Sequence, residues 1–239
     1  GGMGVLVFIM AFLPLGGGQN MHIMRAESPG PEVSKLVPKV KQTALILYSI
    51  YFTLTVIQFI IMMISGMNLF DALNTALATA GTGGFGFRND SFASFSAAQQ
   101  IIVTVFMLLF SINFNSYYLI LRLKFRDAFN SEVRAFFIIV AAAIGIITVN
   151  IYGRYGSITE ALRHAAFAVA SLISTTGFST ENFDVWPSLA KTVLVMIMFI
   201  GACAGSTGGG MKVSRILIMV KGFINETFAL VHPKQVKKI

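Results

Sequence analysis

Charged residues are absent from long stretches of this chain, and these stretches define its architecture. Five intervals contain no Asp, Glu, Lys or Arg: residues 1–24, 42–70, 91–121, 135–153 and 192–211. A helix needs about 20 mostly apolar residues to cross the hydrocarbon core of a bilayer. The pattern therefore predicts an all-α membrane protein whose helices cross or enter the bilayer and are joined by short charged connections.

The apolar stretches are arranged as two copies of one unit. In each copy an apolar segment precedes an acidic residue with Ala-Leu, a helix too short to cross, a turn rich in glycine or threonine, and a second apolar segment. Gly84 and Gly177 hold the same place in the two copies and lie 93 residues apart. We expect each unit to be a helix, a pore loop that enters the bilayer and returns, and a second helix.

Basic connections divide the chain into segments. The expected order is the end of a first-unit inner helix (1–15), a cytoplasmic connector (16–41), the second unit (42–121), a connector (122–134), the third unit with a broken inner helix (135–231) and a cytoplasmic tail (232–239). Within the second unit, residues 97–121 are expected to form one span. Because the chain starts on Gly1 without an initiator methionine, we interpret it as a piece of a larger protein.

The distribution of charge indicates a membrane topology rather than a polyanionic partner. Only 12% of the residues are charged and 55% are hydrophobic, with 18 Lys and Arg against 10 Asp and Glu. If alternate connections face one side, that side holds most of the basic residues. This asymmetry follows the positive-inside rule and makes the basic side cytoplasmic. It explains the net charge of +8 without nucleic acid.

The two turns, residues 82–86 and 174–179, are named the first and second return segments, and both suit a dehydrated potassium ion. Channels replace the water of potassium with rings of backbone carbonyls. Successive carbonyls point the same way only if the backbone alternates in hand, which glycine tolerates. We expect K+ as the transported ion and no organic cofactor. The candidate filter residues are Thr82, Gly83, Gly84 and Phe85, with Ser174, Thr175, Thr176, Gly177 and Phe178.

Acidic residues stand near the start of both short helices. Asp71 lies near the start of the helix expected over 68–80, and Glu160 near the start of the helix over 158–173. A negative charge is favourable at the positive end of a helix dipole. Ser157 and Glu160 also have the spacing of a capping box. We interpret Asp71 and Glu160 as pore-helix caps and not as ion ligands.

A glycine-rich stretch interrupts the last apolar segment. Each glycine inside a helix costs about 1 kcal/mol relative to alanine. Non-helical backbone at membrane depth persists only where protein buries it or a water-filled cavity solvates it. We therefore expect this glycine loop to line the conduction path and gate it. Its residues are Gly201, Ala202, Cys203, Ala204, Gly205, Ser206, Thr207, Gly208, Gly209 and Gly210.

Enzyme chemistry is not indicated. Residues 205–212 resemble a nucleotide phosphate loop, but Met211 intrudes before Lys212 and Val213 replaces the required hydroxyl. The surrounding segments are apolar spans and give no sign of a parallel sheet. Cys203 is the single cysteine of the chain, so no intrachain disulfide is expected. No nucleophile is paired with a base, and we predict that the protein is not an enzyme.

Several motifs together resemble the bacterial Trk potassium-uptake membrane subunits, within the wider Trk, Ktr and HKT superfamily. They lie at residues 1–4, 25–31, 83–85, 174–178, 201–213 and 230–233. The resemblance implies a pseudo-fourfold pore of four helix–pore-loop–helix repeats on one chain, with the glycine loop as a gate below the filter. It also implies a homodimer in the bacterial cytoplasmic membrane, in contact with lipid and with a cytoplasmic nucleotide-binding regulatory subunit.

Thr82 and Thr176 differ from residues often found in that family, where the two positions are often aliphatic and alanine. Selection between potassium and sodium is therefore left open. Two alternatives also remain. A sodium or potassium symporter would bind its substrate at broken helices near the midplane, but both units here run in the same orientation. A non-conducting membrane scaffold would require the return segments to be plain loops.

Overall fold

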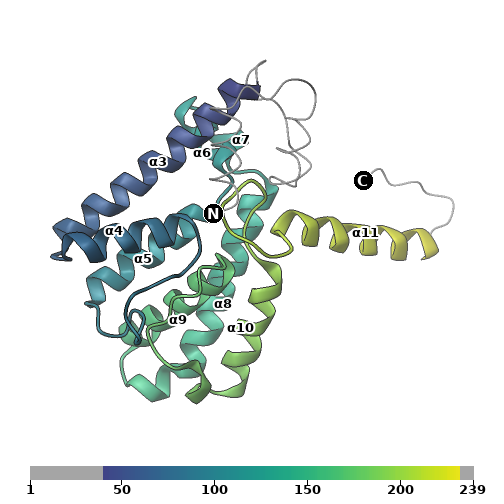
Figure 1. The fold of residues 1–239 in the computed structure, drawn as a ribbon. Helices are drawn as coiled ribbons and strands as arrows, with labels where there is room; N and C mark the ends of the chain where they lie inside the picture. Colours follow the sequence, from purple (N-terminus) through teal and green to yellow (C-terminus); the bar gives the residue numbers. More distant parts are fainter. Residues whose placement is uncertain (1–39, 232–239) are drawn as a thin grey trace.

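The computed structural model describes residues 40–231, and regular structure in this range is helical throughout (Figure 1). The predicted segment 1–15, nearly all of connector 16–41 and the tail 232–239 lie outside the described residues. The elements are α3 (Val40–Ile64), α4 (Leu69–Ala80), α5 (Ala97–Phe110), α6 (Phe114–Leu121), α7 (Phe125–Ala128), α8 (Ser131–Tyr155), α9 (Ile158–Ile173), the 3-10 helix η1 (Phe183–Val185), α10 (Ser188–Ile200) and α11 (Val213–Val231).

Two of the described helices are long and apolar enough to cross a membrane. They are α3 from Ala44 onward and the whole of α8. The pair α5 and α6 passes the same test together, although the two helices are bent by 90° at the break between them. A further apolar helix, α10, is shorter and stops at the glycine loop.

The span predicted over residues 97–121 is not one helix. It breaks at Ser111, and α6 starts after Asn113, whose side chain accepts a hydrogen bond from the Asn115 amide at 2.9 Å. A side-chain acceptor of this kind stabilises a new helix start. The break stands at the same place in the second unit as residues 204–206 of the glycine loop do in the third, 93 residues later.

One hydrophobic cluster belongs to the second unit alone, and two others join the units. The largest cluster lies mainly among α8, α9 and α10 and includes Ile112 of the second unit, and a smaller one lies among α3, α4, α5 and α6. The other joining cluster includes Phe92 and Val103 of the second unit and Phe167 and Phe178 of the third. Because Phe178 belongs to the second return segment, the contact between the units also positions that segment. Helix α11 extends away from this packed body (Figure 1).

The starts of the two short helices differ from the predicted caps. Asn68, not Asp71, is the N-cap of α4, and it accepts a hydrogen bond from the Asp71 amide at 2.8 Å. Ser157 makes no side-chain cap at α9, because its hydroxyl is bonded to that of Thr159 at 2.8 Å. The capping box with Glu160 is therefore not formed. Both acidic residues still lie in the first helical turn, where the dipole favours them.

We predict that Phe167→Ala destabilises the contact between the units. Phe167 is fully buried, and its ring centroid lies 5.6 Å from that of Phe92. Truncation should lower the free energy of unfolding by about 3 kcal/mol, because phenylalanine-to-alanine changes leave a cavity in a packed core. Thermal unfolding in detergent measures the effect. Phe52→Ala is the matched control because Phe52 is 58% exposed and should tolerate truncation. Equal melting temperatures for the two variants would contradict this account of the core.

Candidate ion-conduction site

The two return segments leave their helices with the same backbone geometry. The carboxyl end of each short helix is closed by four amide-to-carbonyl hydrogen bonds, and the two sets match position by position with the 93-residue spacing. The bonds run from Gly81 to Leu77, Thr82 to Thr79, Gly83 to Ala78 and Gly84 to Ala78, and from Ser174 to Ala170, Thr175 to Leu172, Thr176 to Ser171 and Gly177 to Ser171. The repeat is therefore present in the backbone although the side chains differ.

The sign of φ alternates along both return segments, as is required for successive carbonyls to point the same way. Positive φ occurs at Thr82 (48°) and Gly84 (63°), and at Thr175 (60°) and Gly177 (87°). Gly83 and Thr176, which lie between these residues, do not have a positive φ. A positive φ is a strained conformation for a β-branched residue, with a cost of order 1 to 3 kcal/mol. Each threonine is held there by the glycine loop, as described below.

The two segments lie against each other. A Cβ placed on Gly84 would come within 1.8 Å of the Thr176 carbonyl oxygen, so the second segment occupies the space beside this glycine. Beyond the glycines, the Phe92 amide donates to the Ser179 carbonyl at 2.8 Å, and the Ser179 amide donates to the Ser91 hydroxyl at 3.1 Å. Backbone from both units thus meets along the length of the candidate filter.

The carbonyl groups of the segments are not used in hydrogen bonds within the described chain. In residues 40–231, no donor bonds to the carbonyl oxygens of Thr82, Gly83, Gly84, Thr175, Thr176 or Gly177. The next carbonyl of the second segment, on Phe178, accepts from the Ser171 hydroxyl at 2.6 Å. Buried backbone carbonyls are nearly always paired. Of these residues Thr82 and Thr176 are buried, Gly84 and Thr175 are half-buried, and Gly83 and Gly177 are exposed. A run of unpaired carbonyls on two adjacent segments is therefore an array of oxygens available to a cation.

The aromatic residues after the glycines differ between the units. Phe178 is 3% exposed and packs on Phe92 with ring centroids 4.7 Å apart. Phe85 is 81% exposed and lines an apolar groove along α4 with Leu73 and Leu77. Phe178 of the third unit is thus buried against the second unit, whereas the equivalent residue of the second unit, Phe85, is exposed.

The glycine loop contacts both return segments at the ends next to their short helices. The Thr82 hydroxyl donates to the Thr207 carbonyl at 2.9 Å, and the Gly209 amide donates to the Thr175 hydroxyl at 2.7 Å. Thr82 and Thr175 are equivalent residues of the two units, so the loop is joined to the inner end of each candidate filter segment. Residues 201–208 are buried, which is the condition under which irregular backbone persists at membrane depth.

The broken helix of the second unit supplies further partners for the loop. The Cys203 amide donates to the Ser111 carbonyl at 3.0 Å, and the Thr207 hydroxyl donates to the Phe110 carbonyl at 3.1 Å. In return, the Phe114 amide donates to the Gly205 carbonyl at 3.0 Å. Each break therefore provides hydrogen-bond partners for backbone groups that have no helical partner at the other break.

One residue that the sequence analysis missed binds the loop from α8. Glu132, in the first turn of α8, accepts hydrogen bonds from the Ala204 amide at 2.7 Å and the Ser214 amide at 3.2 Å. It is 8% exposed. The available signal was an acidic residue at the end of a mostly basic connector, just before an apolar span. Lys212 closes the other end of the loop by donating to the Gly208 carbonyl.

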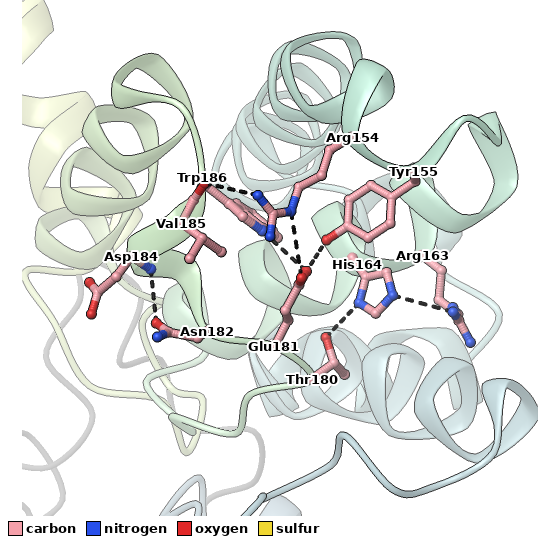
Figure 2. Close-up of polar contacts among 10 residues, drawn as sticks. All are labelled: Arg154, Tyr155, Arg163, His164, Thr180, Glu181, Asn182, Asp184, Val185 and Trp186. Atoms are coloured by element: carbon pink, nitrogen blue, oxygen red, sulfur yellow. Dashed lines mark hydrogen bonds and ion pairs between the residues drawn. The ribbon is translucent and has the colours of Figure 1, made fainter.

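A second missed group surrounds the outer ends of the return segments, meaning the ends away from the glycine loop. Arg88 pairs with Asp71 at 3.1 Å, and Glu181 lies among Arg154, Tyr155 and Trp186 (Figure 2). A hydrogen bond with Ser94 lowers the pKa of nearby Asp90 below its ordinary value. The charged residues at this end therefore come from both units.

The comparisons with known proteins agree with this geometry. A family model described as "TrkH: Cation transport protein" matches residues 1–239. The chain belongs to this TrkH family. The assignment confirms the resemblance seen in the motifs, and with the helical structure and its long apolar helices it makes the chain an all-α membrane protein.

Individual TrkH relatives align with essentially the whole of this chain, and each alignment covers about half of the relative. The Trk system potassium uptake protein TrkH of Halomonas elongata is 38% identical over 245 residues, covering 99% of this chain and 50% of the relative. The same-named protein of Escherichia coli K12 is 36% identical over 248 residues, covering 100% and 51%. The crystal structure of the potassium transporter TrkH from Vibrio parahaemolyticus matches with a TM-score of 0.82 at 32% identity, covering 100% and 49%. The chain spans about half the length of each.

We predict that Glu132→Ala exposes the glycine loop. The change removes the acceptor of two amides, and a hydrogen bond to a charged group contributes about 1.5 to 3 kcal/mol. Local opening should therefore become about tenfold or more frequent. Cys203, buried next to Ala204, reports the change through its rate of modification by a thiol reagent, located by peptide mass spectrometry. Glu226→Ala, at an exposed position of α11, should leave the rate unchanged. A wild-type labelling rate in Glu132→Ala would exclude this role.

Proposed function

We propose that this chain forms part of a potassium-translocating pore, in which the two return segments bind dehydrated ions. The observation that carries the proposal is the set of unpaired carbonyls on two adjacent segments with matching, alternating backbone. Carbonyl rings of this kind replace the hydration shell of potassium. The short helices α4 and α9 end at the segments, and their negative carboxyl ends favour a cation there. The potassium uptake named for the relatives supports the choice of ion.

The glycine loop is proposed as the gate. It contacts both segments at Thr82 and Thr175, and is made of residues that adopt irregular backbone. It is held by four hydrogen bonds to the break in the second unit and by one to Glu132, not by a continuous helix. The loop moves aside when a small number of hydrogen bonds break, so opening requires no rearrangement of the spans.

The surroundings of the pore extend the proposal. Two return segments provide half of a fourfold ring of oxygens, so the pore requires two further units. The exposed groove with Phe85 and Leu73 supports this, because the equivalent face of the third unit is covered by the second. We further propose the bacterial cytoplasmic membrane as the location, a homodimer as the assembly and a cytoplasmic nucleotide-binding subunit as the regulator, as the family resemblance implies.

The rival functions predict different contacts. A scaffold with plain loops gives no reason for strained threonines or for carbonyls left without donors on adjacent segments. A symporter built from inverted repeats would place equivalent ends of its units on opposite sides, whereas the equivalent residues Thr82 and Thr175 both bond to the glycine loop. The channel-like pore accounts for both observations.

We predict that Gly84→Ala reduces discrimination against sodium more strongly than Gly177→Ala. The added methyl of Gly84→Ala collides with the Thr176 carbonyl, whereas a Cβ on Gly177 meets nothing within 4 Å and adds only the strain of a positive φ. We expect about a tenfold loss of the potassium-to-sodium uptake ratio for Gly84→Ala, equivalent to about 1.4 kcal/mol. The measurement is isotope uptake by potassium-uptake-deficient bacterial cells that carry the variant gene.

Gly153→Ala in α8 is the control for this pair, because it also places a methyl where nothing lies within 4 Å, but within a helix. Its uptake ratio should equal that of the wild type. Unchanged selectivity in Gly84→Ala, at wild-type abundance, would remove the return segments from the pore.

We predict that Thr207→Val raises potassium flux without changing selectivity. The substitution removes the hydroxyl bond to Phe110 but keeps the Thr207 carbonyl that binds Thr82. Loss of one bond of about 1 kcal/mol should favour the open loop about fivefold. Flux into proteoliposomes checks this. Thr192→Val is matched, since its hydroxyl makes a similar backbone bond at an exposed site on α10. A lower flux, or a changed ion ratio, would count against the gate.

A further inference from the structure

The outer end of each return segment is tied to its own short helix by polar side chains. Arg88 follows Gly84 by four residues, and Glu181 follows Gly177 by four residues. The same 93-residue spacing relates Asp71 of α4 to His164 of α9. The two units therefore place polar residues at equivalent positions, although the residue types and their partners differ.

In the second unit the partner is an ion pair. The Arg88 guanidinium lies 3.1 Å from the Asp71 carboxylate, whose side chain is only 7% exposed. The same guanidinium donates to the Ser94 hydroxyl at 2.9 Å and stacks over the Phe95 ring at 4.3 Å. Arg88 thus joins the return segment to the start of α4 and to the chain that leads into α5.

In the third unit a carboxylate takes the place of the arginine. Glu181 accepts hydrogen bonds from the Tyr155 hydroxyl and from the Trp186 indole at 3.3 Å, and lies 3.7 Å from Arg154 (Figure 2). His164 completes the connection to α9. Its Nδ1 is bonded to the Thr180 hydroxyl at 2.9 Å, and its ring stacks on Tyr155 at 5.0 Å.

The opposite charges of Arg88 and Glu181 distinguish a role in attracting cations from a role in positioning the return segments. A residue that attracts cations to the pore mouth is expected to be acidic in both units, yet the second unit has an arginine. The feature common to both is a set of bonds beyond the outer end of the return segment. Arg88 bonds to α4, whereas in the third unit Thr180 bonds to α9 and Glu181 bonds to the end of α8 and to Trp186. Only three residues separate Arg88 from Gly84 and Glu181 from Gly177, so a shift of either anchor moves the carbonyls next to it.

We propose that Arg88 and Glu181 are positioning residues for cation selection, which fix the outer ends of the return segments so that their carbonyls keep the spacing suited to potassium. The inference rests on the proposed pore function. It predicts that selectivity depends on the bonds these residues make and not on the sign of their charge.

Arg88→Gln and Glu181→Ala test the proposal in cells that lack other potassium uptake. Each should lower the potassium-to-sodium uptake ratio about threefold or more, a change within the range measured for partly exposed ion pairs. In Arg88→Gln the buried Asp71 loses its partner, so we also use the double variant Asp71→Asn, Arg88→Gln, which pairs two amides. This variant should recover most of the wild-type ratio.

Lys191→Gln is the control, because Lys191 is exposed and its ammonium donates to the Asp184 carbonyl near Glu181. It removes a positive charge from the same end without touching a return segment, and its ratio should equal the wild-type value. An unchanged ratio in Arg88→Gln or Glu181→Ala at normal abundance overturns the proposal, and so does an equal fall in Lys191→Gln. If Arg88→Gln does not reach the membrane, Glu181→Ala decides alone.

The uptake ratio of the wild-type protein distinguishes a failure of the proposed function from a failure of the positioning role. If it shows no preference for potassium, the proposed function fails and the inference falls with it. If it selects potassium while the variants keep its ratio, only the positioning role is wrong.

Discussion

The hydrogen bonds between the glycine loop and the inner ends of the two return segments are the constraint on which the site depends. Thr82 and Thr175 occupy a backbone conformation that β-branched residues avoid, and each is held there by one bond to the loop. The same loop satisfies carbonyls freed by the break after Phe110. The geometry of the return segments, the bend of the second unit and the position of the loop are therefore determined together.

This coupling explains how a strained site remains stable inside a membrane. Unpaired backbone groups are costly in hydrocarbon, so two breaks at the same depth would be unfavourable if each had to be solvated separately. Here the breaks bond to each other, and Glu132 takes two further amides. The arrangement also makes the loop dependent on a few bonds, which is the property required of an element that moves while the surrounding spans keep their packing.

Much of the fold followed from the sequence, and the exceptions share a cause. The long apolar stretches, the short helices and the glycine loop all have local signatures in composition and spacing. The bend at 111–113 has no glycine or proline, and the cap at α4 belongs to Asn68 where the acidic Asp71 was expected. Glu132, Arg88 and Glu181 were missed because their partners lie 17 to 82 residues away or on other elements.

The sequence by itself determined that the chain is an all-α membrane protein, that it contains two related units 93 residues apart and that a glycine-rich break interrupts the last apolar segment. Apolar length and backbone freedom are local properties, so composition specifies them. Only the tertiary structure decided that Gly84 lies against the Thr176 carbonyl, that the loop reaches both threonines and that the two breaks bond to each other. These contacts join separate units, and their distances depend on how whole helices pack, which no local pattern encodes.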